Sequence, residues 1–370
     1  MEDTREAFSL EKYLSNGVDR IVTGIMKASI RNPKASLFLI RHGADSRKAR
    51  KIREEAEERG EHIPPFLIAS ITNRCNLHCK GCYARANKSC SDQGNTAGMM
   101  KGEDWGHIFS QAEALGIEFI LLAGGEPFVR EDVLSEAGKH RRILFPVFTN
   151  GTMIEEPYIE MLQKNPNLLP VISIEGNEGT TDERRGAGIY QKLQCVMQKL
   201  QKQGILFGAS ITVTKQNMEE VLSDSFVKEL EGRGTKGIVY VEYVPVNDDT
   251  QELAPDDEDR EKMKRRLAEL REGGTDLVLV SFPGDEKTSG GCLAAGRGFF
   301  HINAFGGAEP CPFSPYSDTN LKNTALRQAL QSPLFCSLRS NGNLTEHHIG
   351  GCVLFEQKEQ VERLLLEGRT

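Results

Sequence analysis

Three cysteines, Cys75, Cys79 and Cys82, stand at the spacing C-x₃-C-x₂-C directly after the apolar run 65–71. A short apolar run predicts a strand, so the thiols are expected on the loop that follows it. Three thiolates on one loop can hold three irons of a [4Fe-4S] cluster and leave the fourth iron without a protein ligand. The spacing therefore predicts a cluster at which a small molecule can bind an open iron.

Other uses of these thiols give different spacings. A cluster that only carries electrons needs a fourth cysteine nearby, but Cys90 lies eight residues beyond Cys82 and fits neither ferredoxin pattern. Zinc sites favour C-x₂-C pairs in twos. A zinc knuckle and three unrelated buried thiols are the alternatives to the cluster.

At these residues the chain resembles the radical S-adenosylmethionine (SAM) superfamily, whose signature is C-x₃-C-x₂-C with an aromatic residue beside the last cysteine. Here Tyr83 follows Cys82. The resemblance implies that SAM binds the open iron and that an external donor of the flavodoxin or ferredoxin type supplies an electron. SAM is then cleaved to methionine and a 5′-deoxyadenosyl radical, which abstracts a substrate hydrogen.

The elements that must position these cysteines alternate between two patterns. Apolar runs separated by helical stretches predict a parallel sheet wrapped by helices. Six such βα units make an α/β fold, a partial (β/α)6 barrel, whose active site lies at the C-terminal ends of the strands. The predicted strands are 66–71, 119–123, 143–149, 169–174, 206–213 and 238–246, followed by a last strand at 277–283.

The chain is long for one domain and short for three. Residues 1–63 are predicted to be a helical extension that covers one side of the barrel, with a charged helix at 46–60. The barrel is predicted to span residues 64–284, and residues 285–370 are predicted to form a small auxiliary domain. A helix is expected to begin at Ala254-Pro255-Asp256.

A second motif, Gly124-Gly125-Glu126-Pro127, follows the second predicted strand. Its glycines suit a close backbone approach, and its proline suits the start of a helix. It resembles the radical SAM motif in which backbone carbonyls and the glutamate bind the amino group of the methionine moiety. An ordinary βα turn is the alternative.

Further candidates for the SAM site lie after later strands. By resemblance, Ser173 lies near the ribose and Arg185 binds the methionine carboxylate, for which a planar guanidinium suits bidentate pairing. The alternative is that Arg185 and its neighbour Arg184 cap a surface helix. Weaker candidates for the wall of the SAM site are Asn150, Thr212 and Tyr243.

A second set of cysteines begins near residue 290. Cys292 and Cys311 flank alternating apolar residues and a Gly306-Gly307 turn, which predicts a β-hairpin with a thiol near each base. The pattern C-x₁₃-G-x₄-C resembles the opening of the SPASM domain and of its shortened form, twitch. The resemblance implies that Cys292, Cys311 and Cys352 hold one auxiliary [4Fe-4S] cluster.

The fourth ligand of this auxiliary cluster is left open. Cys336 on a predicted helix could complete the set, or it could be a buried helix residue. His347 and His348 could ligate instead, and His348 stands where the longer SPASM pattern has a cysteine. With none of them the iron could bind substrate. Cys90 and Cys195 are expected to be ordinary thiols.

Composition limits the class of protein. The chain has 370 residues, of which 38% are hydrophobic and 27% charged, which is ordinary for a globular protein. A formal net charge of −7 argues against a broad basic face for nucleic acid. No apolar run is long enough to span a membrane, and the acidic N-terminus lacks a signal sequence, so a cytoplasmic location is expected.

The resemblance implies a radical SAM enzyme whose auxiliary cluster supports a net oxidation. We expect modification of a peptide or protein by crosslinking, thioether formation or dehydrogenation. One alternative is the same chemistry on a small molecule: a tetrapyrrole, an aminocyclitol or a cofactor precursor. Another is a non-enzymatic iron-sulfur electron carrier or redox sensor. No catalytic residue is assigned beyond the cluster.

Overall fold

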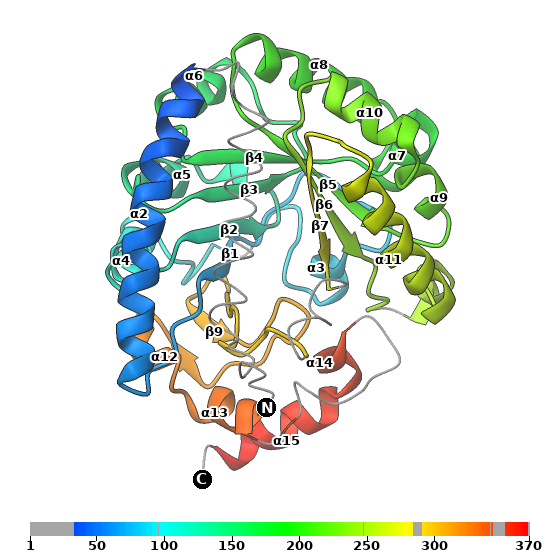
Figure 1. The fold of residues 1–370 in the computed structure, drawn as a ribbon. Coiled ribbons are helices and arrows are strands. Elements are labelled where there is room, and N and C mark those ends of the chain that lie inside the picture. Colours follow the sequence, from blue (N-terminus) through cyan, green and yellow to red (C-terminus); the bar gives the residue numbers. More distant parts are fainter. Residues whose placement is uncertain are drawn as a thin grey trace, which may run out of the picture.

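The fold is an open parallel barrel surrounded by helices (Figure 1). The computed structural model describes residues 33–94, 96–246, 248–283, 291–340, 342 and 352–368. Their strands form one sheet in the order β10-β9-β8-β1-β2-β3-β4-β5-β6-β7. β1 to β7 are parallel and follow one another in chain order, so the predicted α/β partial barrel is confirmed.

Each strand of the barrel is connected to the next through one or more helical segments. The strands are β1 Phe66–Thr72, β2 Phe119–Gly124, β3 Phe145–Thr149, β4 Leu168–Ser173, β5 Gly208–Val213, β6 Gly237–Glu242 and β7 Val278–Phe282. The connecting helices are α3 Tyr83–Ala86, α4 Gly102–Ala114, η1 Pro127–Val129, α5 Glu131–Lys139, α6 Glu156–Lys164, α7 Glu178–Arg185, α8 Ile189–Lys202, α9 Met218–Val221, α10 Asp224–Gly232, η2 Asp248–Leu253 and α11 Asp257–Glu272.

All seven predicted strands of the barrel form, but β6 ends at Glu242 rather than at Val246. Beyond Glu242 the chain turns toward the end of β5, where the backbone N–H of Tyr243 donates to the carbonyl of Val213 at 3.0 Å. The apolar residues after Glu242 are therefore buried at the end of the barrel rather than in its sheet. Apolar composition alone cannot separate these two forms of burial.

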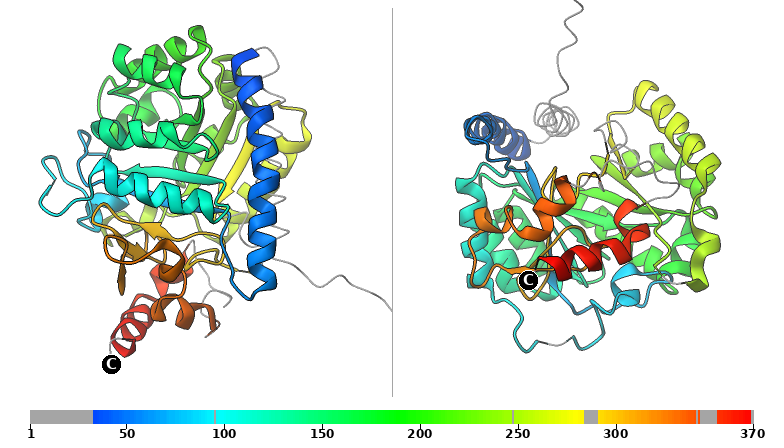
Figure 2. Two further views of the ribbon diagram at one scale, coloured as in Figure 1. Left: turned by 90° about the vertical axis from the view of Figure 1, so that its left-hand side faces the viewer. Right: turned by 90° about the horizontal axis from the view of Figure 1, so that it is seen from below.

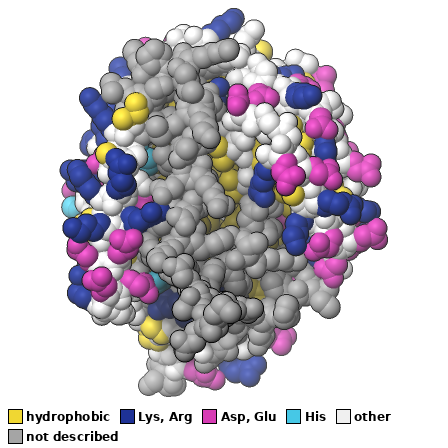
Figure 3. All heavy atoms as spheres, viewed as in Figure 1, with side chains coloured by type: hydrophobic (Ala, Val, Ile, Leu, Met, Phe, Trp, Pro, Cys, Tyr) yellow, Lys and Arg dark blue, Asp and Glu magenta, His cyan; other side chains and the backbone are white. Residues whose placement is uncertain are grey.

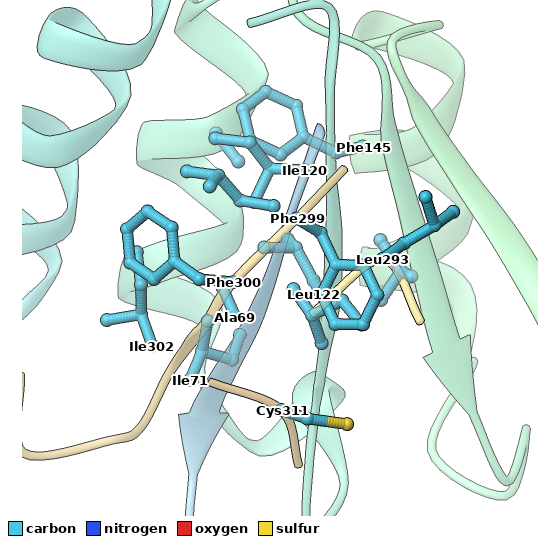
Figure 4. Packing of buried hydrophobic residues seen from close by; sticks show 14 of the residues in the cluster. Ala69, Ile71, Ile120, Leu122, Phe145, Leu293, Phe299, Phe300, Ile302 and Cys311 are labelled. Carbon is cyan, nitrogen blue, oxygen red and sulfur yellow. The ribbon is translucent and has the colours of Figure 1, made fainter. Parts of the chain in front are cut away.

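Local sequence explains where the helices begin and which face they bury. α11 begins where the sequence predicts a helix start, and Asp256 and Asp259 cap this start reciprocally, each accepting the other's backbone N–H at 3.1 Å. Figure 4 shows the core that lies between the sheet and the helices, with Ala69 of β1 beside Leu122 of β2. Burying this apolar face is the main stabilising contribution.

The helix α2, Pro33–Glu58, covers the end of the barrel where the strands begin. Its Phe38 packs with Leu144, Leu169 and Leu206, which stand at or just before the starts of β3, β4 and β5. Figure 2 shows α2 lying across the stacked barrel helices, on the side away from the loops after β1. The opposite end of the barrel is thus left for the site.

A buried ion pair fastens α2 to the barrel. Arg53 Nη2 lies 2.6 Å from Glu118 Oε1, and these side chains are 1% and 2% exposed. The Ser46 hydroxyl donates to Glu118 Oε2 at 2.7 Å, and Arg53 Nη1 donates to the carbonyl of Gly116 at 2.5 Å. The charges are therefore both paired and hydrogen-bonded, which buried charges require.

The C-terminal part extends the barrel sheet. β8 His301–Ile302 pairs in parallel with the free edge of β1, β9 Gly307–Glu309 pairs antiparallel with β8, and β10 Thr319–Asn320 pairs antiparallel with β9. The predicted hairpin is confirmed, with its turn at Gly306. The helices α12 Leu326–Ala329, α13 Pro333–Ser340, α14 Val353–Glu356 and α15 Lys358–Glu367 follow. The domain boundary near residue 284 stays a prediction.

Charged side chains of both signs alternate on the visible flanks of the molecule (Figure 3). Among the described residues, no helix combines the length and the apolar composition that a membrane span requires.

We predict that Arg53→Met lowers the free energy of unfolding by about 3 to 5 kcal/mol, because it leaves the Glu118 carboxylate buried without its charged partner. Denaturant unfolding followed by circular dichroism measures this change. Lys51→Ala is the matched control on the same helix, since Lys51 is 76% exposed and lies 3.8 Å from Glu55. A loss no larger than that of the control would contradict the prediction.

Candidate active site

The three cysteines of the first motif lie together on the loop that leaves β1. Cys75, Cys79 and Cys82 are free thiols of intermediate exposure, and Cys82 directly precedes α3. The loop is at the C-terminal end of the parallel strands, where the active sites of such barrels lie. The predicted position of these thiols in the fold is confirmed.

Arg85 and Asp92 hold this loop in shape. The guanidinium of Arg85 donates to the carbonyls of Leu77 at 2.7 Å and Cys75 at 3.3 Å, and to the carboxylate of Asp92 at 2.7 Å. The backbone N–H of Cys75 donates to the carbonyl of Ser91 at 3.1 Å. The loop is therefore anchored by its own downstream segment, which returns alongside it.

The protonation of the thiols depends on their neighbours. A hydrogen bond with Cys90 lowers the pKa of Cys75 to about 6 and raises the pKa of Cys90. Burial raises the pKa of Cys79, although the charge of Arg185 opposes this effect. Metal ligation requires the thiolate form, which the partners of Cys75 and the cation beside Cys79 favour.

The two glycines of the second motif are required by the exit of β1. A Cβ on Gly125 would lie 1.9 Å from the carbonyl oxygen of Arg74, and one on Gly124 would lie 2.3 Å from that of Thr72. The N–H of Gly125 donates to the Thr72 carbonyl at 2.9 Å, and that of Glu126 donates to the Arg74 carbonyl at 2.7 Å. The motif thus packs directly on the cysteine loop.

Glu126 is a buried carboxylate with three protein donors. The backbone N–H of Phe128 and the hydroxyl of Thr149 donate to Oε1 at 3.1 and 2.6 Å, and the N–H of Asn150 donates to Oε2 at 2.7 Å. Burial raises the pKa of Glu126 to about 7, although all three donors act to lower it. This group is therefore poised to change charge near neutral pH.

Arg185 connects the first cysteine loop with the end of β4. Its Nε and Nη2 donate to Glu175 Oε1 at 2.9 and 2.5 Å, and its Nη1 lies 3.9 Å from the sulfur of Cys79. Glu175 is fully buried and also binds Arg184. Of the two arginines, Arg185 is thus the one whose side chain contacts a cysteine of the loop. Its role toward SAM stays a prediction.

The remaining candidates for the SAM site lie around the same end of the barrel. Asn150 Nδ2 is 4.0 Å from the sulfur of Cys75, and Ser173 ends β4 opposite Ser210. The N–H of Thr212 donates to Glu175 Oε2 at 2.9 Å. Tyr243 packs on the cysteine loop, because a Cβ on Gly81 would lie 2.5 Å from its hydroxyl.

The second set of cysteines is brought together in part. A hydrogen bond links Cys311 and Cys352 and lowers the pKa of Cys352, and Cys292 is near enough for its charge to raise the pKa of Cys311, which burial raises most. Cys336 on α13 contacts Gln331 at 3.8 Å and Arg339 at 3.5 Å. His347 and His348 lie outside the described residues.

Tyr83 lies between the two sets of cysteines. Its ring contacts that of Phe313, two residues after Cys311, with the ring centres 5.0 Å apart. Burial raises the pKa of the Tyr83 phenol, and the charges of Cys82 and Cys311 raise it further, so both thiols are within electrostatic reach. The loop after β1 and the loop after β9 therefore face each other.

Sequence reasoning missed three residues of this site. It left Cys90 as an ordinary thiol, treated Tyr83 only as part of the cysteine motif, and assigned no role to Glu175. Cys90 reaches Cys75 because Ser91 forms a bridge with Arg74. Only Glu175 carried a sequence signal, as an acidic residue at the end of a buried strand.

The thiols fit iron-sulfur clusters better than a single metal ion. Within the described part of the chain, no group of three or more His, Cys, Asp or Glu side chains is arranged to hold one ion. In a [4Fe-4S] cluster each thiolate binds a different iron, which spreads the ligands apart. Three free thiols on one loop, with Arg185 and Asn150 beside their sulfurs, match that need.

The structure is an open parallel α/β barrel with three free cysteines on the loop after its first strand. This arrangement is that of an α/β-barrel enzyme that binds an iron-sulfur cluster at the C-terminal ends of its strands. Residues 69–224 match the family model described as the radical SAM superfamily. This part of the chain, which runs from within β1 through β5 to the start of α10, is therefore a radical SAM domain.

Curated relatives and solved structures carry the similarity beyond this domain. The chain is 26% identical to an AdoMet-dependent heme synthase of Methanosarcina barkeri, over 80% of this chain and 89% of the relative. It is 27% identical to the PqqA peptide cyclase of Granulibacter bethesdensis, over 67% and 68% of the two chains. The structure of Streptococcus suis SuiB bound to S-adenosylmethionine shares the fold, with a TM-score of 0.64 at 18% identity over 80% of this chain and 72% of SuiB.

We predict that Gly125→Ala displaces the cysteine loop, because its Cβ would overlap the carbonyl of Arg74. The expected cost is about 1 to 3 kcal/mol of stability, together with loss of at least half of the iron bound after anaerobic reconstitution. Iron analysis and thermal unfolding measure both.

The matched control is Gly43→Ala in α2, where nothing lies within 4 Å of the added Cβ. It should stabilise the helix by about 0.5 to 1 kcal/mol and leave iron binding unchanged. Equal iron content in both variants would contradict the assignment of Gly125 to the support of the loop.

Proposed function

We propose that this radical SAM enzyme oxidatively modifies a peptide or protein, by crosslinking, thioether formation or dehydrogenation. The observation that carries the proposal is the facing arrangement of the two cysteine loops, joined by the contact between Tyr83 and Phe313. A site between two clusters suits a reaction that removes a hydrogen atom and then an electron from one substrate. Further support comes from relatives that act on peptides.

Cys75, Cys79 and Cys82 would hold the first [4Fe-4S] cluster, which when bound supplies the reductive cleavage of SAM to the 5′-deoxyadenosyl radical. The chain's own contribution is orientation. Arg185, held by buried Glu175, would bind the methionine carboxylate, and Glu126 would accept the amino group. An external electron donor of the flavodoxin or ferredoxin type completes the requirement.

Cys292, Cys311 and Cys352 would hold the one auxiliary [4Fe-4S] cluster. The thiol of Cys336 contacts Gln331, just before α13, and Arg339 on α13 itself, so we do not include it. The fourth position would then be open to substrate or to a residue outside the described ranges. The sequence alone left Cys336 open as the fourth ligand.

Two of the similar proteins support a peptide as the substrate. SuiB has been solved with its precursor peptide SuiA bound, with a TM-score of 0.62 at 19% identity over 80% of this chain and 71% of SuiB, and PqqA peptide cyclase acts on a peptide by its name. The heme synthase relative, covered over 89% of its length, favours a tetrapyrrole as the second candidate. We place the peptide first.

The test begins with anaerobic reconstitution and assay of 5′-deoxyadenosine with dithionite and SAM. We expect about eight irons per chain, four for each cluster, and loss of deoxyadenosine by at least a hundredfold in Cys79→Ala. Cys195→Ala, on the exposed surface of α8, is the matched control and should retain the activity. A fully loaded wild type that forms no deoxyadenosine would favour an electron carrier or sensor instead.

Substrate classes are separated in the same assay by two probes. One is the set of peptides translated from short reading frames that flank the gene, and the other is iron coproporphyrin III. Loss of two hydrogens from a peptide, dependent on Cys79, supports the first proposal. Loss of carboxyl groups from the porphyrin, with unchanged peptides, supports the second.

We predict that SAM binding weakens as the pH falls through about 7, the pKa to which burial raises Glu126. Below that pH the carboxyl group is neutral and cannot pair with the ammonium group of SAM; above it the carboxylate can. The limiting slope is about tenfold per pH unit for one group.

Equilibrium dialysis of the oxidised, cluster-loaded protein measures this slope. Glu126→Gln should bind weakly with the slope removed, whereas Glu131→Gln, an exposed change at the start of α5, should keep it. Identical pH profiles for wild type and Glu126→Gln would rule out Glu126 as the partner of the ammonium group.

A further inference from the structure

Three side chains outside the cofactor site form a hydrogen-bonded chain across β1, β8 and β9. The Ser70 hydroxyl lies 2.7 Å from His301 Nε2, and His301 Nδ1 lies 2.7 Å from Glu309 Oε2. Asn303 Nδ2 donates to the other carboxylate oxygen of Glu309 at 2.5 Å. The order hydroxyl, imidazole, carboxylate is that of a proton-transfer relay.

The hydrogen bonds fix which nitrogen of His301 carries the proton. An ionised carboxylate only accepts hydrogen bonds, so Glu309 must receive one from Nδ1 of His301. In the neutral ring Nε2 then carries the lone pair and accepts the Ser70 hydroxyl. His301 is therefore held as a base directed at Ser70.

The relay faces the interior of the barrel. Side chains alternate along a strand, and Ala69 and Ile71 lie with Ile302 on the side of the helices, as Figure 4 shows. Ser70 therefore points to the opposite side. His301, which precedes Ile302 and is paired with Ile68 of β1, points to the same side as Ser70.

The relay is also close to the two cysteine loops. Glu309 stands two residues before Cys311 on the segment that leads from β9, and its charge contributes to the raised pKa of Tyr83, after burial and the nearby thiols. Phe313, which contacts Tyr83, follows on the same segment. Glu309 thus lies near the two cysteine loops, between which the proposed substrate must bind.

The three side chains of the relay differ in how deeply they are buried. His301 is 5% exposed and Glu309 is 6% exposed, whereas Ser70 has intermediate exposure. A molecule in the barrel would therefore meet the Ser70 hydroxyl first. Burying an imidazole and a carboxylate is costly unless both are hydrogen-bonded, as they are here.

We propose that His301, reached through the Ser70 hydroxyl and oriented by Glu309, takes up the proton that the substrate releases during oxidation. This rests on the proposed function. In the proposed function, the 5′-deoxyadenosyl radical would remove one hydrogen atom from a substrate C–H bond. The auxiliary cluster that Cys292, Cys311 and Cys352 would hold would act as the one-electron acceptor and remove one electron.

The second hydrogen leaves as a proton: its X–H bond breaks, X bonds to the oxidised carbon, and the proton passes to Ser70 while Ser70 gives its own proton to His301 Nε2. The substrate loses two hydrogens in all, as a hydrogen atom, an electron and a proton.

The relay specifies the kind of reaction. Crosslinking, thioether formation and dehydrogenation each release a proton for every electron removed, so they need a base beside the substrate. Oxidative loss of a carboxylate releases carbon dioxide in place of the proton and needs no base. The relay therefore favours a substrate that loses two hydrogens over one that is decarboxylated.

Ser70 is not placed as a nucleophile. Nucleophilic serines of this arrangement stand on sharp turns beside backbone N–H groups that stabilise an oxyanion. Ser70 lies within β1, which is paired with β2 on one edge and β8 on the other. The backbone around Ser70 is thus committed to the sheet.

The first test concerns the tautomer and needs no substrate. Nitrogen-15 NMR of the oxidised, cluster-loaded chain with labelled histidine, assigned with His301→Gln, should show a neutral ring protonated at Nδ1. Glu309→Gln should shift the proton toward Nε2, because an amide can donate as well as accept. A wild-type ring protonated at Nε2 overturns the relay whatever the substrate is.

The second test measures modified peptide formed per 5′-deoxyadenosine, with the peptides translated from the flanking reading frames as probes. Ser70→Ala and His301→Gln should keep deoxyadenosine formation within about twofold of wild type and lower the ratio at least tenfold. Ser332→Ala, a serine-to-alanine change at a buried position outside the relay, should not change the ratio.

Other outcomes overturn the proposal. An unchanged ratio of modified peptide to deoxyadenosine would show that the network only stabilises the pairing of β1 with the hairpin. Equal losses of deoxyadenosine and product, with a lowered melting temperature, would show the same. Labelling of Ser70 by a fluorophosphonate would make it a nucleophile. If no probe peptide loses hydrogens in the wild type, the peptide assignment fails, and the tautomer measurement still decides the relay.

Discussion

The site depends on one close approach, between the chain that leaves β1 and the chain that leaves β2. The N–H groups of Gly125 and Glu126 donate to the carbonyls of Thr72 and Arg74. A side chain on Gly124 or Gly125 would overlap these carbonyls, so the close approach requires glycine at both positions. The first cysteine of the loop, Cys75, directly follows Arg74. The shape of the loop is therefore set by backbone contact between two parallel strands, before any side chain contributes.

Two buried carboxylates extend this constraint around the barrel. Glu126 joins the exits of β2 and β3 through Thr149 and Asn150, and Glu175 joins the exits of β4 and β5 through Thr212. Both carboxylates accept hydrogen bonds, and Glu175 also forms ion pairs with Arg184 and Arg185. A buried charge requires such partners. Together they bring residues from four successive loops to one end of the sheet.

The C-terminal hairpin completes the site because it uses the open edge of β1. By pairing β8 with β1, the chain places Glu309 and Cys311 near the loop that began more than two hundred residues earlier. The sheet edge that a partial barrel leaves unpaired is here covered by the segment that carries the second cysteines. One strand thus supports the cofactor loop on its end and the relay on its inner face.

Sequence alone determined the features that are written locally. The spacing of Cys75 to Cys82, the order of seven apolar runs and the Gly306 turn each depend on neighbouring residues, so they could be predicted, with strand ends in error where apolar residues such as Tyr243 are buried outside the sheet. Only the tertiary structure decided that Cys90 returns to Cys75 and that Ser70, His301 and Glu309 meet. Those contacts join residues from different strands or loops, and no periodicity records them.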